Sequence, residues 1–315
     1  MIRRQGLQVL VGYHDRDMSR SFKAKQSTVD HSSRIGLGTA QFGLDYGISN
    51  ITGQTPIDSV TEILKYCFQK NITTIDTAHT YGNSEQAIGR AGDSKLFDVV
   101  TKTIPTFKKE IRPDHIKIVC DGVFESLRRL GLDRLHGLLV HHCDDLVNPG
   151  GDLLFRTLSE LKSEGFFSKI GVSVYSAKEI DFVLKNYDLD LIQIPMNVFD
   201  QRLLHSGTLQ RFKNLGIEVH VRSAFLQGIV FMEPKGLPHN IANHSLHLIN
   251  FQRAINKLGI SPATACLAFL MQQAEIDKVI CGVNSLSQLS ELIETVSVLP
   301  LIEKDFFDSL AVDDE

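Results

Sequence analysis

Short apolar runs rich in valine, isoleucine and leucine return along this chain, and they restrict its fold more than any other feature. Eight such runs occur, at 35–40, 72–76, 97–102, 136–141, 169–173, 190–194, 217–222 and 278–282. Continuous apolar runs of this length are typical of strands that are buried on both faces of a sheet. Such strands need helices to cover them.

Segments with helical spacing lie between most of the runs. In residues 59–71 the apolar side chains recur every three or four positions, and residues 115–132 repeat the pattern until Gly131 ends it. Alternating strands and helices favour parallel pairing through right-handed crossovers, and eight strands favour a closed (β/α)8 barrel of one domain. An open dinucleotide-binding sheet would need a G-x-G-x-x-G turn, and the glycines of residues 35–43 have a different spacing.

Composition narrows the class of protein. Residues 1–33 are polar and lack periodicity, so we predict a mobile extension before a barrel over residues 34–315. The chain has 33 Lys plus Arg against 37 Asp plus Glu, a net charge of −4, so neither nucleic acid nor a membrane surface is an expected partner. Five scattered cysteines form no zinc ligand set, and we expect no metal. Free thiols without an apolar span favour the cytoplasm.

Polar side chains stand where the predicted strands end, which is where chemistry collects in such a barrel. These side chains are Asp76, Lys102, His141, Ser173, Gln193 and Arg222. Each one alone has an ordinary structural explanation, as a turn cap, a surface lysine or a packed histidine. Together they predict an active site at one rim.

The stretch DTAHTYGNSE (76–85) adds a phenol to this rim. A phenol is a poor proton donor at neutral pH, but a nearby ammonium stabilises its ionised form. We therefore expect Asp76 and Lys102 to tune Tyr81 as a general acid, with His141 beside it and Gly82 turning the loop back over the rim. An acid without a nucleophile suits the reduction of a carbonyl group.

The same stretch resembles the signature of the aldo-keto reductase family, and the resemblance continues in order over about residues 34–300. VVTK (99–102) resembles the strand that carries the family's lysine, and LHGLLVHHCDD (135–145) resembles the segment with its histidine. The resemblance implies a catalytic tetrad of Asp76, Tyr81, Lys102 and His141. It also implies a (β/α)8 barrel that binds extended NADPH, or NADH, and transfers hydride to a small-molecule carbonyl substrate.

Cofactor contacts follow from three further segments that resemble the family: IGVSVYS (170–176), VRSAFLQGIV (221–230) and KVICGVNSLSQLSELIE (278–294). The residues that they imply, with Thr39 from the first strand, are Thr39, Ser173, Gln193, Arg222, Ser223, Phe225, Gln227, Gly228, Gly282, Asn284, Ser285, Gln288 and Glu291. Helix N-terminal amides after Gly282 are expected to receive a phosphate.

Five positions depart from the family's pattern, and one of them is Leu292, which stands where many members have an asparagine. Val174 stands for an asparagine, Ala224 for a proline, Arg222 for an aromatic residue that often stacks on the nicotinamide, and Gln288 for an arginine. We hypothesise that Arg222 also contacts an anionic substrate or a cofactor phosphate. The loss of the arginine at 288 weakens the argument for a 2′-phosphate.

The substrate pocket is expected to include Gln41, Phe42, His79, His142 and residues of the loop 229–250. The chain has no tryptophan, and residues 37–54 look like the opening of a bacterial subgroup often associated with surface-polysaccharide pathways. We therefore expect a polar, sugar-like carbonyl. Two alternatives stay open: a catalytically weak, cofactor-binding regulatory subunit of the same fold, and an aldolase that forms a Schiff base through Lys102.

Overall fold

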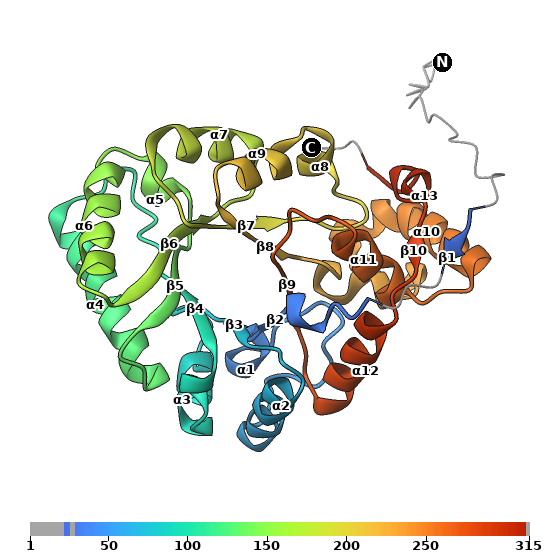
Figure 1. Ribbon diagram of the computed structural model, residues 1–315, viewed down its shortest axis with the longest axis horizontal. Coiled ribbons are helices and arrows are strands. Elements are labelled where there is room, and N and C mark those ends of the chain that lie inside the picture. Colours follow the sequence, from blue (N-terminus) through green and yellow to red (C-terminus); the bar gives the residue numbers. More distant parts are fainter. Residues whose placement is uncertain (1–21, 26–28, 313–315) are drawn as a thin grey trace, which may run out of the picture.

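Eight parallel strands close into a barrel with helices around it, as the sequence predicted (Figure 1). The computed structural model describes residues 22–25 and 29–312. The barrel strands follow one another in sequence order, and the last pairs with the first. They are β2 (Ile35–Gly38), β3 (Thr74–Asp76), β4 (Asp98–Lys102), β5 (Leu135–Val140), β6 (Phe167–Ser173), β7 (Leu191–Pro195), β8 (Glu218–Arg222) and β9 (Lys278–Gly282).

The helices that cover the barrel begin and end at recognisable signals. Gly131, at φ +68°, ends the fourth helix, and Ser176 with Glu179 forms a capping box on the seventh. The helices are α1 (Ala40–Gly43), α2 (Ile57–Gln69), α3 (Ser84–Ala91), α4 (Pro113–Leu130), α5 (Asp144–Val147), α6 (Gly151–Ser163), α7 (Ala177–Asn186), α8 (Arg202–His205), α9 (Thr208–Asn214), α10 (Ser245–Leu258), α11 (Pro262–Met271), α12 (Leu286–Ser297) and α13 (Lys304–Asp308).

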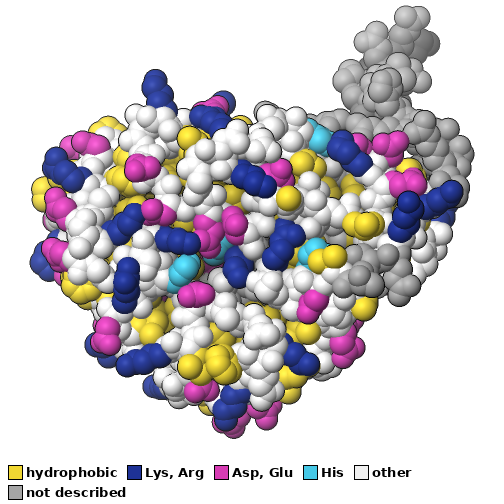
Figure 2. All heavy atoms as spheres, in the orientation of Figure 1, with side chains coloured by type: hydrophobic (Ala, Val, Ile, Leu, Met, Phe, Trp, Pro, Cys, Tyr) yellow, Lys and Arg dark blue, Asp and Glu magenta, His cyan; other side chains and the backbone are white. Residues whose placement is uncertain are grey.

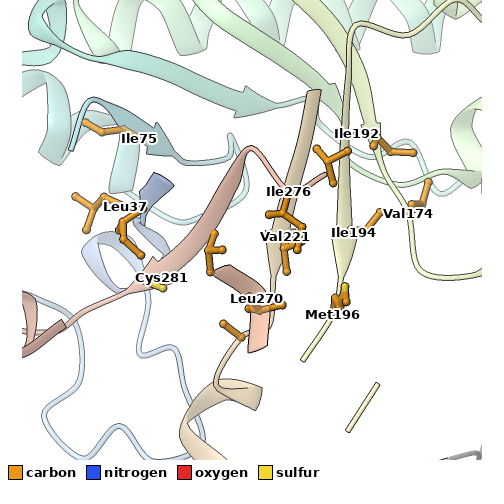
Figure 3. Packing of buried hydrophobic residues seen from close by; sticks show 14 of the residues in the cluster. Leu37, Ile75, Val174, Ile192, Ile194, Met196, Val221, Leu270, Ile276 and Cys281 are labelled. Atoms are coloured by element: carbon orange, nitrogen blue, oxygen red, sulfur yellow. The ribbon is translucent and has the colours of Figure 1, made fainter. Parts of the chain in front are cut away.

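The main core fills the space between the strands and the helices. Figure 3 shows part of it, with side chains of β7, β8 and α11 such as Ile194, Val221 and Leu270. A second, smaller cluster holds Val100, Leu139 and Leu191. Because successive side chains of a strand alternate in direction, this second cluster fills the inside of the barrel while the main core lies outside it.

The same alternation places polar side chains inside the barrel at the carboxyl ends of its strands. The Thr101 hydroxyl donates to Glu85 of α3 over 2.7 Å, so Thr101 points outward and its neighbour Lys102 points inward. Lys102 follows the inward-facing Val100 by two residues, and Gln193 follows the inward-facing Leu191 by two. Both side chains therefore point inward as well, one step nearer to the carboxyl ends of the strands than the apolar cluster.

The beginning of the described chain packs against its end. β1 (Ala24–Lys25) pairs antiparallel with β10 (Leu301–Ile302), and the ring of Phe22 lies edge-on to Phe306 with centroids 5.4 Å apart. Part of the segment that we predicted to be a mobile extension is thus placed against the barrel. Residues 1–21 and 26–28 lie outside the described residues, so for them the expected mobility stays a prediction.

The surface carries both signs of charge. Figure 2 shows acidic and basic side chains interspersed over the viewed face. In the described part of the chain, no single helix is long and apolar enough to cross a membrane; segments 239–258 and 262–271 reach that length and hydropathy only as a pair, and the pair is bent by 88°.

Candidate active site

A buried ion pair forms the base of the site. Asp76 and Lys102 are the last residues of β3 and β4, and their side chains are 5% and 1% exposed. Lys102 Nζ lies 2.6 Å from Asp76 Oδ1 and also donates to the Thr77 carbonyl oxygen over 2.9 Å. Burial alone would lower the pKa of Lys102, but Asp76 and Tyr81 outweigh it and raise that pKa. The lysine is therefore an ammonium at neutral pH.

Tyr81 lies above this ion pair. Lys102 Nζ is 4.9 Å from the centroid of the phenol ring. Behind the tyrosine, Gly82 has φ +54°, and a Cβ placed there would lie 2.2 Å from the carbonyl oxygen of Gly43. Only glycine fits such a close approach of two backbones. The Tyr81–Gly82 turn is thereby pressed against the end of α1, which fixes the position of the phenol.

His141 completes the group from the residue after β5. Its ring lies edge-on to the Tyr81 ring, with centroids 5.9 Å apart, and its Nδ1 is 3.2 Å from the Thr80 hydroxyl. Burial, and then the charge of Lys102, lower the pKa of His141 to about 4. The imidazole is therefore neutral at physiological pH. The structure brings together all four residues of the predicted tetrad.

The end of β3 is held by a second set of contacts. The backbone N–H and the hydroxyl of Thr39 both donate to the Asp76 carbonyl oxygen over 3.0 Å. Ser84, at the start of α3, donates to the Thr39 carbonyl oxygen over 2.8 Å. The final acid of the 76–85 stretch, Glu85, is buried and accepts from Arg129 of α4 at 3.5 Å. These contacts tie the tyrosine loop to two strands and two helices.

Gln193 of β7 reaches across the barrel to the same carboxylate. Its Nε2 donates to Asp76 Oδ2 over 2.7 Å. An ionised carboxylate only accepts, so the nitrogen of the amide must face Asp76 and the oxygen must face the other way. In the described part of the chain this buried Gln193 Oε1 has no hydrogen-bond partner. An unpaired acceptor of this kind calls for a donor from a bound molecule.

A long cleft starts at Asp76 and Tyr81 and runs to α12. The loop 46–52, the segment after β8 and one face of α12 form its walls. Twelve of the residues predicted for cofactor or substrate line it: Thr39, Gln41, Gln193, Arg222, Ser223, Phe225, Gln227, Gly228, Gly282, Asn284, Gln288 and Glu291.

The loop 44–54 bridges this cleft, and sequence reasoning missed its residues. Ile48 N–H donates to the Gln227 carbonyl oxygen over 2.9 Å, and Asn284 Nδ2 lies 3.2 Å from the Thr52 hydroxyl. The loop thus contacts the segments after β8 and after β9. Tyr46, Ser49 and Asn50 are among its lining residues. Because the loop has neither helical nor strand periodicity, only its position after the first strand could have indicated them.

Arg222 lies at the inner end of the cleft as a half-buried cation. Its guanidinium carbon is 4.1 Å from the centroid of the Tyr175 ring. Its Nη2 donates to the Val174 carbonyl oxygen over 3.2 Å, and its Nη1 is 3.4 Å from the Ser223 hydroxyl. Within the described ranges no carboxylate forms an ion pair with Arg222.

Several predicted residues lie elsewhere. Ser173 is buried at the end of β6, and the Ser285 hydroxyl caps α12 by accepting from the Gln288 N–H over 3.2 Å. His142 packs edge-on against Phe107, with centroids 5.4 Å apart, outside the cleft lining.

Two of the predicted substrate residues need correction. Phe42 is fully buried, because α1 points its ring into the main core between the strands and the helices. His79 lies beside Gly122 of α4. Of the loop 229–250, only Phe231 is among the residues that line the cleft, since most of the remainder forms short 3-10 turns and the start of α10.

Comparison with known proteins agrees with this geometry. The family model described as "Aldo/keto reductase family" matches residues 34–311. The aldo-keto reductase YhdN of Bacillus subtilis is 31% identical over 56% of this chain and 53% of its own length. A probable aldo-keto reductase of Glycine max is 26% identical over 86% of each chain. A probable voltage-gated potassium channel subunit beta of Arabidopsis thaliana is 24% identical, over 88% of this chain and 93% of its own.

Solved structures share the fold. The holo form of an aldo-keto reductase from Bacillus halodurans superposes with a TM-score of 0.70 at 20% identity, covering 92% of this chain and 97% of that one. A putative aldo-keto reductase from Pseudomonas aeruginosa gives a TM-score of 0.62 at 20% identity, over 90% and 98% of the two chains.

Proposed function

This chain belongs to the aldo/keto reductase family, and we propose that it reduces an aldehyde or ketone to an alcohol with a nicotinamide dinucleotide bound in the cleft. The observation that carries the proposal is the Asp76–Lys102 ion pair buried under the ring of Tyr81. Burying two charges carries a large desolvation cost, so a barrel end with only a structural role would gain little from such a pair.

Each residue of the tetrad has a separate task in this reaction. When bound, a reduced nicotinamide supplies the hydride that goes to the carbonyl carbon. The Tyr81 hydroxyl gives its proton to the carbonyl oxygen, and the Lys102 ammonium stabilises the negative charge that the phenol acquires. Asp76 keeps Lys102 charged and in place. Neutral His141 is able to donate a hydrogen bond to the carbonyl oxygen without competing as an acid.

The residues of the cleft fit such a cofactor. The unpaired Gln193 Oε1 needs a donor, and the amide of a nicotinamide carboxamide supplies one. At the other end, Asn284, Gln288 and Glu291 line the cleft beside the start of α12. We expect NADPH to bind. Arg222 is the only lysine or arginine among the described lining residues, so no cation at the α12 end selects a 2′-phosphate, and NADH should also be accepted.

For the substrate we propose a polar, sugar-like carbonyl of the kind handled in surface-polysaccharide pathways, reduced in the cytoplasm. The missing tryptophan and the hydroxyl-bearing rim residues Tyr46 and Thr80 support a polar pocket. Comparing rates with glyceraldehyde and with butanal, which is close to it in size but lacks hydroxyl groups, tests this choice. A preference for butanal would contradict it.

A Tyr81→Phe exchange tests the reaction itself. We expect the variant to bind NADPH as the parent does, because the ring keeps its shape, and to lose about 10²- to 10⁴-fold in the rate of carbonyl reduction. Binding is measured from the fluorescence of the nicotinamide and rate from its absorbance. Reduction at the parental rate would show that another group donates the proton.

The likeness to potassium channel beta subunits favours one rival, a cofactor-binding regulatory subunit with slow turnover. Tight dinucleotide binding without turnover of any carbonyl tested would support that rival. The aldolase alternative needs a neutral amine at Lys102, and the raised pKa of this lysine disfavours it.

A further inference from the structure

The inner end of the cleft carries a net positive charge that the proposed reaction does not use. Two of its charges, Asp76 and Lys102, cancel within their ion pair. His141 adds none, because it is neutral above a pKa of about 4. Arg222 remains, half-buried against Tyr175 and without an ion pair in the described part of the chain. Among the described residues that line this end of the cleft, it is the one uncompensated charge.

The chemistry of carbonyl reduction places the nicotinamide close to this charge. Hydride and proton go to the two atoms of one carbonyl bond, so the ring that gives the hydride must lie beside the Tyr81 hydroxyl. Arg222 lines the same end of the cleft as Tyr81, Asp76 and Gln193. A nicotinamide that satisfies Gln193 Oε1 is therefore a near neighbour of the guanidinium.

The two redox forms of the cofactor differ in the charge of that ring. The oxidised nicotinamide is a cation and the reduced one is neutral, while the phosphates and the adenosine are the same in both. We propose, on the basis of the function proposed above, that Arg222 discriminates between the two forms by repelling the oxidised ring. The site then fills with reduced dinucleotide and releases the oxidised product quickly.

The magnitude follows from Coulomb's law at a partly solvated site. Two unit charges a few ångströms apart near a protein surface interact strongly enough to change an equilibrium by about tenfold or more, and salt weakens the effect. We expect the ratio of the oxidised to the reduced dissociation constant to fall about tenfold in Arg222→Gln, which corresponds to ~1.4 kcal/mol.

The test is a set of binding constants measured without turnover. Reduced NADPH and NADH are titrated by their own fluorescence, and NADP⁺ and NAD⁺ are measured by displacing them. Arg222→Gln and Arg222→Met remove the charge with two different shapes, whereas Arg222→Lys keeps it. Arg156→Gln, at an exposed position of α6, makes the same change in net charge far from the cleft. ADP-ribose, which lacks the nicotinamide, controls for the adenosine end.

The expected pattern is a lowered ratio in both neutral variants, an unchanged ratio in Arg222→Lys and Arg156→Gln, and unchanged ADP-ribose binding throughout. A parental ratio in both neutral variants would overturn the inference and leave the proposed reductase intact. If no dinucleotide binds to the parent protein, the proposed function itself fails.

Discussion

His141 shows how one residue is adapted by its surroundings. An imidazole ordinarily titrates near pH 6.5, but burial and the charge of Lys102 lower the pKa of His141 to about 4. A protonated histidine here would compete with Tyr81 as the acid and would face the Lys102 ammonium. The neutral form avoids both conflicts and keeps an N–H for the carbonyl oxygen.

This depressed pKa predicts a pH dependence of stability. Between about pH 6.5 and 4 the unfolded chain binds a proton at residue 141 that the folded protein does not, so stability is complete above pH 6.5 and falls towards pH 4. Between pH 7 and pH 4.5, the free energy of unfolding should fall in both proteins, and we expect it to fall by about 1–2 kcal/mol less in His141→Gln than in the parent. Urea unfolding measures this difference. His142→Gln, at a side chain that is 41% exposed, is the control. Equal losses in the parent and His141→Gln would refute the assignment.

At the level of elements, the loop 44–54 depends on one glycine in the segment after β8. Gly228 has φ +92°, and a Cβ there would lie 1.8 Å from the Ser49 hydroxyl oxygen. The two segments that wall the cleft therefore meet only because position 228 has no side chain. The close approach of Gly228 to Ser49 therefore holds the loop across the cleft together with the hydrogen bond from Ile48 to Gln227.

We expect Gly228→Ala to weaken dinucleotide binding. The new methyl group must push the loop away from the segment after β8, in addition to the backbone strain of about 1 kcal/mol that any residue with a Cβ meets at positive φ. Gly216→Ala is the matched control, because Gly216 has φ +70° and nothing lies within 4 Å of its Cβ position. Thermal unfolding and NADPH titration should show a similar strain in both variants but a binding defect in Gly228→Ala alone. Equal binding in the two would contradict the role of the contact.

The elements of the barrel could be predicted from sequence, whereas parts of the site could not. Strands such as 278–282 and helices such as 115–132 carry their periodicity in the sequence, and strand ends such as Asp76 and Lys102 follow from it. The burial of Phe42 depends on how the short helix α1 packs, and the position of His79 beside α4 depends on the turn after β3. Neither packing arrangement leaves a periodic pattern in the sequence. The Gln193–Asp76 contact joins strands far apart in sequence, so it becomes visible only in the closed barrel.

At the scale of the whole molecule, the barrel has charged groups at both ends. At the end opposite the site, Glu218 of β8 contacts Lys169 of β6 and lies 2.7 Å from His220 Nε2 and 3.8 Å from His136 Nε2. Burial alone would raise the pKa of Glu218, but hydrogen bonds from these three residues outweigh it and hold the pKa well below its ordinary value. This cluster joins three strands.

Glu218 should therefore contribute to stability at neutral pH and lose that contribution in acid. Its folded-state pKa is depressed, so the contribution is present above about pH 4.3, the ordinary value for glutamate, and declines as the pH falls below it. We expect Glu218→Gln to lower the free energy of unfolding by on the order of 1–3 kcal/mol at pH 7 and by less at pH 3, as measured by urea unfolding. Glu125→Gln, which breaks ion pairs with Arg128 and Arg129 at the surface, should have a smaller effect. A pH-independent loss in Glu218→Gln would contradict this explanation.

The pairing of β2 with β9 has a consequence for biosynthesis. Synthesis runs from the N-terminal side, so β2 is the first of the eight barrel strands to emerge and β9 is the last, and seven strands are present before the sheet is able to close. The cleft takes residues from the loop after β2 and from α12, the helix that follows β9. Cofactor therefore has no complete site before α12 has emerged and is unable to guide the folding of the strands that come earlier. Until β9 pairs with β2, the unpaired edges of β2 and of the last emerged strand are open to pairing with other chains.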